Sequence, residues 1–197
     1  MSVALPTSPG PAPLVPSLVR AGNDLVSPLS QAVQRLNRLG DRFAFQVTLP
    51  PMKRDDDAQK WVSRLLQAFA TTATLNYPQP PAGVGTPGAP VCNGTSSGTS
   101  LAVRGLTAGY TIKEGQVFSI IHAGKRYLHM AAADAEADGD GVVTVTVVPA
   151  LRIATADLDV IEIAQPVIEG FVGGAANTWT INVAQTIGLT FTLMESQ

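Results

Sequence analysis

Acidic residues alternate with alanines from residue 134 to 138 and lead into Gly-Asp-Gly, as in the first half of a calcium-binding loop. In an EF-hand loop that begins at Asp134, Glu136 and Asp138 occupy the third and fifth positions and Gly139 the sixth. The twelfth position, which should supply a bidentate glutamate, is Val145. Asp-Gly pairs also favour a tight reversal between strands, and the valines and threonines that follow predict a strand. We interpret the stretch as a β-hairpin, with a weak cation site as the alternative.

A second candidate is the sequence GTSSG at 94–98, which matches the Gly-x-Ser-x-Gly pattern around a hydrolase nucleophile, here Ser96. Glu114 followed by His122 or His129 occurs in the chain order that a catalytic triad would need. The motif works where a strand feeds a sharp turn and then a helix. Here it lies in a Gly/Pro/Ser-rich segment with no helical pattern after it, so we do not expect a serine hydrolase.

The remaining reactive side chains are few. His122 and His129 flank an Ala-Gly turn and could approach each other across a hairpin, but no cysteine or fixed carboxylate completes a zinc site. Cys92 is the one cysteine, so no internal disulfide can form and a reducing compartment is expected. Its neighbours in the sequence predict no lowered thiol pKa.

Charged and glycine-rich stretches have ordinary explanations. Asp55–Asp57 could bind a cation, but three carboxylates also stabilise the start of a helix. The GVG at 83–85 neither follows a convincing strand nor opens a helix, and the basic pairs 53–54 and 125–126 are isolated. The sequence therefore predicts no catalytic residue, no cofactor and no metal ligand, and we expect a protein that is not an enzyme.

Composition indicates a partner instead. The 197 residues carry a net charge of −2, so nothing indicates a nucleic-acid-binding surface. Only 14% of residues are charged, against about 25% in typical domains. Mean hydropathy is +0.19, yet the longest apolar stretch, 142–151, is too short to cross a membrane, and the N-terminus does not resemble a signal peptide. We infer that partner subunits cover part of the surface.

The first half of the chain predicts short, mixed elements. Five prolines in the first sixteen residues predict an extended arm over 1–23. Within 24–77, we predict a short helix at 28–39, a strand at 43–49, a helix that opens at Asp55–Asp57 and carries Trp61, and a strand at 72–77. Residues 78–99, with five prolines, are predicted to be a long loop.

From residue 100 to 197 everything predicts β-structure. The expected strands are at 100–104, 109–112, 116–122, 125–133, 142–148, 158–164, 167–172, 178–183 and 188–194. Short strands with turn signals between them indicate an antiparallel sandwich or barrel. The predicted fold class is mainly β, with one or two short helices in the N-terminal half.

An ordered string of motifs resembles one protein family. It runs from Gly115-x-x-Phe118-x-Ile120, through Lys125-Arg126-Tyr127 and Asp134-Ala-Glu-Ala-Asp138, to a strand and Pro149-Ala-Leu-Arg152. This string is similar to that of distal tail or minor tail proteins of long-tailed bacteriophages, which are encoded near the tape-measure gene. The first half is more weakly similar, the likeness covers about residues 41–172, and residues 1–40 have no counterpart in it.

The resemblance implies a structural virion protein, made in the host cytoplasm and assembled into the tail. It implies a homo-oligomeric ring, commonly of six copies, that joins the tail tube protein to the hub or tip proteins at the baseplate end. DNA would pass through the ring with only non-specific contact, and no membrane insertion is expected. The alternatives are another ring of the same particle, such as the tail tube or a head–tail connector, and a carbohydrate-binding β-sandwich module.

Overall fold

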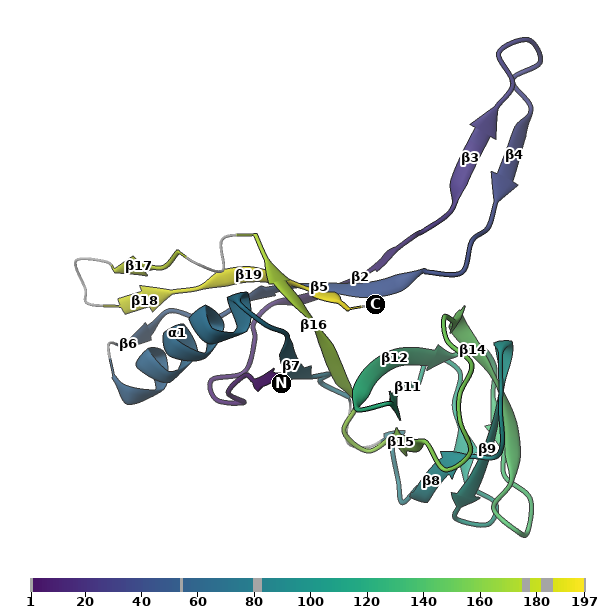
Figure 1. The fold of residues 1–197 in the computed structure, drawn as a ribbon. Helices are drawn as coiled ribbons and strands as arrows, with labels where there is room; N and C mark the ends of the chain where they lie inside the picture. The colour runs from purple at the N-terminus through teal and green to yellow at the C-terminus, as the bar shows by residue number, and fades with distance from the viewer. Residues whose placement is uncertain (1, 54, 80–82, 175–177, 182–185, 197) are drawn as a thin grey trace. The chain divides into compact units, whose positions relative to one another are not determined.

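The computed structural model describes residues 2–53, 55–79, 83–174, 178–181 and 186–196 (Figure 1). The fold is mainly β, as the sequence predicts, and the described residues contain one α-helix. They form two compact units. The first combines the segments before residue 18, at 43–77 and after 166, and the second combines 18–42 with 78–166.

The first unit is built on a six-stranded sheet in the order β1-β7-β16-β19-β5-β2. Its strands are β1 (Val3–Ala4), β2 (Leu14–Val19), β5 (Arg42–Thr48), β7 (Ala73–Asn76), β16 (Val167–Gly173) and β19 (Thr190–Glu195). β1 and β7 are parallel, whereas the pairs from β7 through β16 and β19 to β5 are antiparallel. A smaller sheet has the order β17-β18-β6, from β17 (Thr180–Ile181), β18 (Thr186–Gly188) and β6 (Met52–Lys53).

The helix α1 (Asp56–Phe69) lies where the sequence predicts it. The Asp55 carboxylate accepts a hydrogen bond from the Ala58 amide at 3.1 Å and so caps the helix. One stripe of the helix, which includes Trp61 and Leu65, is buried. The Trp61 ring lies 6.3 Å from that of Phe191 on β19, so the helix covers the sheet through its aromatic side chain.

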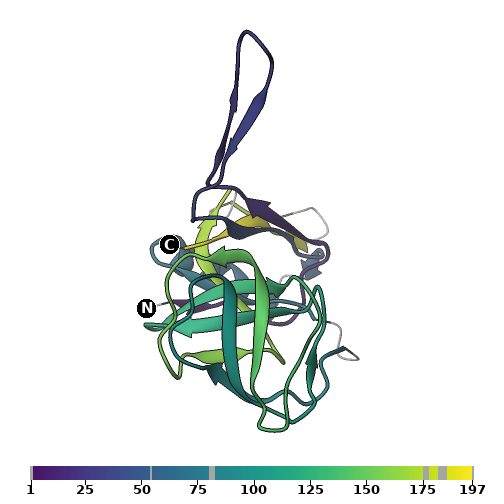
Figure 2. The ribbon, with the colours of Figure 1, turned by 90° about the vertical axis from the view of Figure 1, so that its right-hand side faces the viewer.

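The second unit contains a closed six-stranded barrel (Figure 2). Its strands, in the order β11-β12-β14-β9-β8-β15, are β11 (Val117–His122), β12 (Lys125–Ala131), β14 (Val143–Leu151), β9 (Gly98–Leu106), β8 (Gly88–Cys92) and β15 (Val160–Glu162). Two short strands, β10 (Thr111–Ile112) and β13 (Ala135–Glu136), form a separate antiparallel pair. In the sequence β10 lies between β9 and β11, and β13 between β12 and β14. Alternate valines of β14 fill the barrel core together with Phe118 and Ile120. Of the two architectures that the sequence left open, the barrel is the one this unit has.

The structure groups the chain differently from the sequence-based boundaries. Residues 78–99 include the barrel strand β8, so they are not one loop. Residues after 166 return to the first unit and supply β16 and β19, so 100–197 is not one β-domain. The predicted arm over 1–23 contributes β1 and β2 to the sheet. Pro16 fits in β2 because that strand is at the sheet edge, where a missing N–H is tolerated.

The prediction of a helix at 28–39 is wrong. Residues 23–36 form an antiparallel hairpin of β3 (Asn23–Val26) and β4 (Val33–Leu36), in which Asp24 faces Arg35 and Val26 faces Val33. Between the strands, the Ser27 amide donates to the Ala32 carbonyl at 2.9 Å, and Gln31 adopts a left-handed φ of 54°. The turn at Ser27-Pro28 therefore starts a chain reversal rather than a helix.

Candidate functional site

The acidic stretch forms a tight turn in which its carboxylates bind backbone amides. Asp138 accepts from the amides of Asp140 and Val142, at 3.0 and 2.8 Å. Asp134 accepts from the Glu114 amide at 2.7 Å and lies 3.2 Å from the Lys113 ammonium group. These bonds orient the two carboxylates toward different backbone segments. Among the described residues, no group of three or more His, Cys, Asp or Glu side chains could hold a metal ion.

Ser96, the candidate nucleophile, is a buried structural residue of the barrel. Its hydroxyl accepts from the Ala102 amide at 3.0 Å, and its own amide donates to the Thr155 hydroxyl at 2.9 Å. Gly94 donates from its amide to Asp157 at 2.8 Å. These bonds tie the loop at 93–98 to the loop at 155–159, and they give Ser96 partners other than a histidine.

The two histidines have separate environments. His129 is 2% exposed, and its Nδ1 lies 3.0 Å from the Pro149 carbonyl oxygen. Burial lowers the pKa of His129 to about 4, so it is neutral in the folded chain at neutral pH. His122 is partly exposed, and its Nδ1 lies 2.7 Å from an Asp159 oxygen that also accepts from the Ala156 amide.

The histidines do not approach each other across the hairpin of β11 and β12. His122 faces Lys125, and His129 faces Phe118, so they are four ladder positions apart, or about 13 Å. Cys92 is fully buried, and burial raises the pKa of its thiol to about 11. A thiol with that pKa stays protonated and is a poor nucleophile or metal ligand.

The basic and glycine-rich candidates also have structural partners. Arg126 on β12 makes a two-pronged contact with Glu162 on β15, at 3.1 and 3.3 Å, across β11, which pairs with both strands. The carbonyl of Val84, inside the GVG stretch, accepts from the Tyr110 hydroxyl at 2.6 Å. Lys53 is on β6, whereas Arg54 lies outside the described residues.

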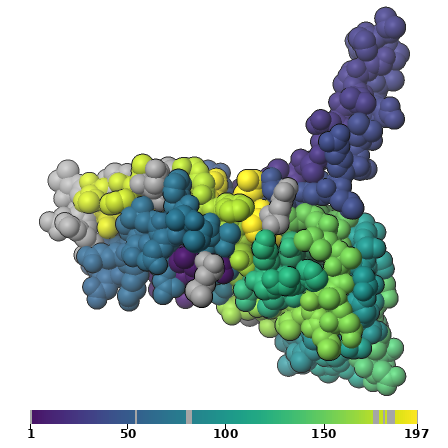
Figure 3. All heavy atoms as spheres, in the orientation of Figure 1, coloured from purple at the N-terminus to yellow at the C-terminus, as the bar shows by residue number. Residues whose placement is uncertain are grey.

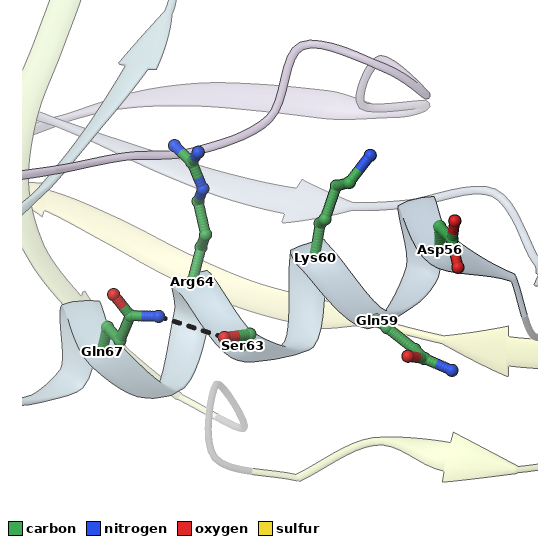
Figure 4. A pocket seen from close by; sticks show the side chains of 6 residues that line it. All are labelled: Asp56, Gln59, Lys60, Ser63, Arg64 and Gln67. Carbon is green, nitrogen blue, oxygen red and sulfur yellow. Dashed lines mark hydrogen bonds between the residues drawn. The ribbon is translucent and has the colours of Figure 1, made fainter.

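A shallow hollow of about 380 Å³ lies on the outer face of α1 (Figure 4). One helix lines it, through Asp56, Gln59, Lys60, Ser63, Arg64 and Gln67. Lys60 and Arg64 point to one side and Gln59 to the other, and the Gln67 amide donates to the Ser63 hydroxyl at 3.0 Å. The side chains do not converge on a common point, so the hollow offers no arrangement for catalysis.

The hairpin of β3 and β4 is different, because it carries apolar side chains that its own unit does not cover. Leu29 at its turn is 98% exposed, and Val26 and Val33 are exposed beside it. In Figure 3 the barrel of the same unit does not cover the end of the hairpin on the face shown. The other exposed large apolar residues of the segment 18–42 are Leu18, Leu25 and Leu39.

Charged residues fix the base of this hairpin. The Arg35 guanidinium contacts both Asp24 oxygens, at 3.1 and 3.3 Å, and lowers the pKa of that carboxyl. Arg20 lies 3.6 Å from the same carboxylate. Asp24 and Arg35 share one face of the ribbon with Val26 and Val33, so an ion pair at the base precedes an apolar end. Such an arrangement is suited to binding a protein surface.

Sequence reasoning missed this hairpin, although a signal was present. The segments NDLV and VQRL place one acidic and one basic residue three positions outside the two ends of the turn at 27–32. That symmetry predicts a cross-strand ion pair, which competes with the helical spacing of Leu29, Val33 and Leu36.

In the described part of the chain, no helix is long and apolar enough to span a membrane. Comparison of the sequence with protein-family models and with curated proteins finds no match.

Proposed function

We propose that this chain is a structural subunit of a ring at the distal end of a bacteriophage tail. The expected ring contains six copies. The ring would join the tail tube to the hub of the tail tip. In this role the chain performs no reaction. It supplies surfaces that bind further copies of itself and the adjoining tail proteins.

The observation that carries this proposal is the exposed apolar hairpin. An isolated two-stranded hairpin is marginally stable in water, and leucine and valine side chains at its end gain nothing from solvent. Exposed apolar side chains that are grouped in this way mark association surfaces. The low charge of the whole chain, 14% of residues, supports the same reading because a ring subunit has much of its surface covered.

The resemblance to distal tail proteins supports the tail as the place of assembly. The motif string that carries it runs through β11, β12, the acidic turn and β14, which are parts of one barrel unit. Those motifs hold no reactive site, and the bonds of Asp134, Asp138 and Arg126 are structural. A shared architecture therefore explains the likeness better than a shared reaction does.

Native mass spectrometry of the purified chain tests the proposal. We expect a closed oligomer, with six copies as the specific expectation, whose mass does not change when calcium is added. A chain that stays monomeric up to its solubility limit would contradict the proposal. Electron microscopy of the oligomer with the tail tube protein of the same particle then separates a distal ring, which caps the tube, from a ring within it.

A further inference from the structure

The barrel unit also exposes large apolar side chains, and they lie close together in the sequence. All four exposed large apolar residues described between 78 and 166 fall within thirteen positions: Val148, Ile153, Leu158 and Val160. Three of them, Ile153, Leu158 and Val160, belong to the loop after β14 and the first residue of β15. We name these three residues the 153–160 patch.

Leu158 is the most unusual residue of this patch. It has a φ of 68°, in the left-handed region, which is rare for a bulky side chain, and it is 62% exposed. Glycine or asparagine would adopt this backbone at less cost and would leave no apolar group in water. Within a single chain the leucine therefore brings two disadvantages. Strain of this kind gathers at functional positions.

Hydrogen bonds hold the loop in this conformation. The Leu158 amide donates to the Cys92 carbonyl at 3.1 Å, and the Ala156 amide donates to Asp159 at 2.7 Å. Asp157 accepts from the Gly94 amide and pairs with Arg104 at 3.0 Å. The patch is thus presented by a fixed loop, which lowers the entropic cost of binding.

We propose, building on the ring function above, that the 153–160 patch of one copy binds the hairpin end of a second copy. The hairpin supplies Val26, Leu29 and Val33, and the patch supplies Ile153, Leu158 and Val160. Charge favours this pairing. Residues 20–42 contain four arginines and two aspartates (+4 − 2 = +2), whereas residues 78–166 contain five basic and eight acidic residues (+5 − 8 = −3).

This contact joins two different surfaces, so it is a head-to-tail interface. Each copy would offer one hairpin and one patch, and repeating the contact closes a ring when the rotation between copies is suitable. A two-fold contact between identical surfaces would stop at a dimer. The proposed pairing therefore explains how one small apolar contact, repeated around a ring, produces a stable assembly.

Three matched leucine-to-asparagine variants test the contact. Leu29→Asn alters the hairpin and Leu158→Asn the patch, while Leu66→Asn makes the same change at an exposed leucine of α1. We expect the first two to raise the concentration for half-assembly by about tenfold or more, and the third to leave it unchanged. Leu158→Asn should keep or raise the melting temperature, because asparagine accepts a left-handed backbone. Weaker assembly with intact folding separates a docking role from a structural one.

Mixing the two defective variants gives the sharpest result. In a mixture of Leu29→Asn and Leu158→Asn, only the intact hairpin of the second can bind the intact patch of the first. Native mass spectrometry should then show a one-to-one dimer and no ring. If the wild type forms a ring but Leu29→Asn or Leu158→Asn assembles normally, the contact is wrong and the ring function stands. If the wild type never assembles, the ring function fails and this contact fails with it.

Discussion

At the scale of single residues, His129 makes the barrel sensitive to acid. Its pKa is about 4 in the folded chain, below the value of 6.5 that it has when exposed, because burial disfavours the charged form. Since the folded pKa is depressed, the unfolded chain binds the proton first as pH falls. Stability is therefore complete above pH 6.5 and is lost progressively between pH 6.5 and 4, by up to about 3 kcal/mol.

We expect this loss to disappear in His129→Phe, which keeps a ring beside Phe118. Urea unfolding at intervals between pH 7 and 4 gives the free energy of unfolding at each pH. The test compares the slope of this free energy against pH in the variant and in the wild type. His122→Gln, at the partly exposed histidine, is the control for replacing an imidazole outside the core. Equal slopes in the wild type and His129→Phe would show that His129 does not carry the effect.

Cys92 gives a second prediction at this scale. Because its thiol is fully buried and its pKa is raised to about 11, we expect no reaction with a thiol reagent at pH 8 in the folded protein. In urea the same thiol should react fully. Mass spectrometry after timed labelling measures both states, and rapid labelling of folded protein would mean that the loop at 93–98 opens readily.

At the scale of elements, Gly141 controls the turn into β14. It has a φ of 73°, and a Cβ at this position would lie 2.1 Å from the Leu106 carbonyl oxygen. We expect Gly141→Ala to lower the free energy of unfolding by on the order of 2–3 kcal/mol, through strain and the lost approach of the two backbones. Gly139→Ala, where nothing lies near the new methyl group, should cost much less. Urea unfolding of the pair tests this, and similar costs at both sites would contradict it.

The sequence predicted those elements whose own residues decide their structure. The alternation in β5 places Phe45 and Val47 in the core, and the strand forms there. The helix α1 follows from its cap at Asp55 and its apolar stripe. The prediction of a helix at 28–39 failed because Leu29, Val33 and Leu36 fit the helix period, whereas the cross-strand pairs favour a hairpin.

Other features depend on partners far along the chain and are not visible in local patterns. β8 contains Gly88 and Pro90, which argue against a strand, yet pairing with β9 and β15 makes it one. Leu158 reads as an ordinary apolar residue in the sequence. Its left-handed backbone is held by the bond from its amide to the carbonyl of Cys92, which lies far away in the sequence and which the barrel brings close.

At the scale of the whole molecule, the unequal charge of its parts predicts how salt acts on assembly. Residues 20–42 carry +2 and residues 78–166 carry −3, so added salt should weaken the proposed contact between the hairpin of one copy and the patch of the next. We expect the concentration for half-assembly to rise as sodium chloride increases from about 0.05 to 0.5 M, and to rise less in Arg38→Gln. Lys60→Gln, at an exposed ammonium group of α1, is the matched control. Analytical ultracentrifugation measures each case, and an identical salt response in Arg38→Gln and the wild type would exclude this arginine from the attraction.

The position of β16 and β19 in the first unit has a consequence for how the chain folds during translation. These two strands lie in the middle of the sheet, between β7 on one side and β5 on the other. They leave the ribosome after the entire barrel segment, whose strands are already available to pair with one another. Until then the sheet exists as two separate halves, β1 with β7 and β2 with β5. The barrel is therefore expected to mature first on the nascent chain, and the sheet to close only when its two central strands arrive.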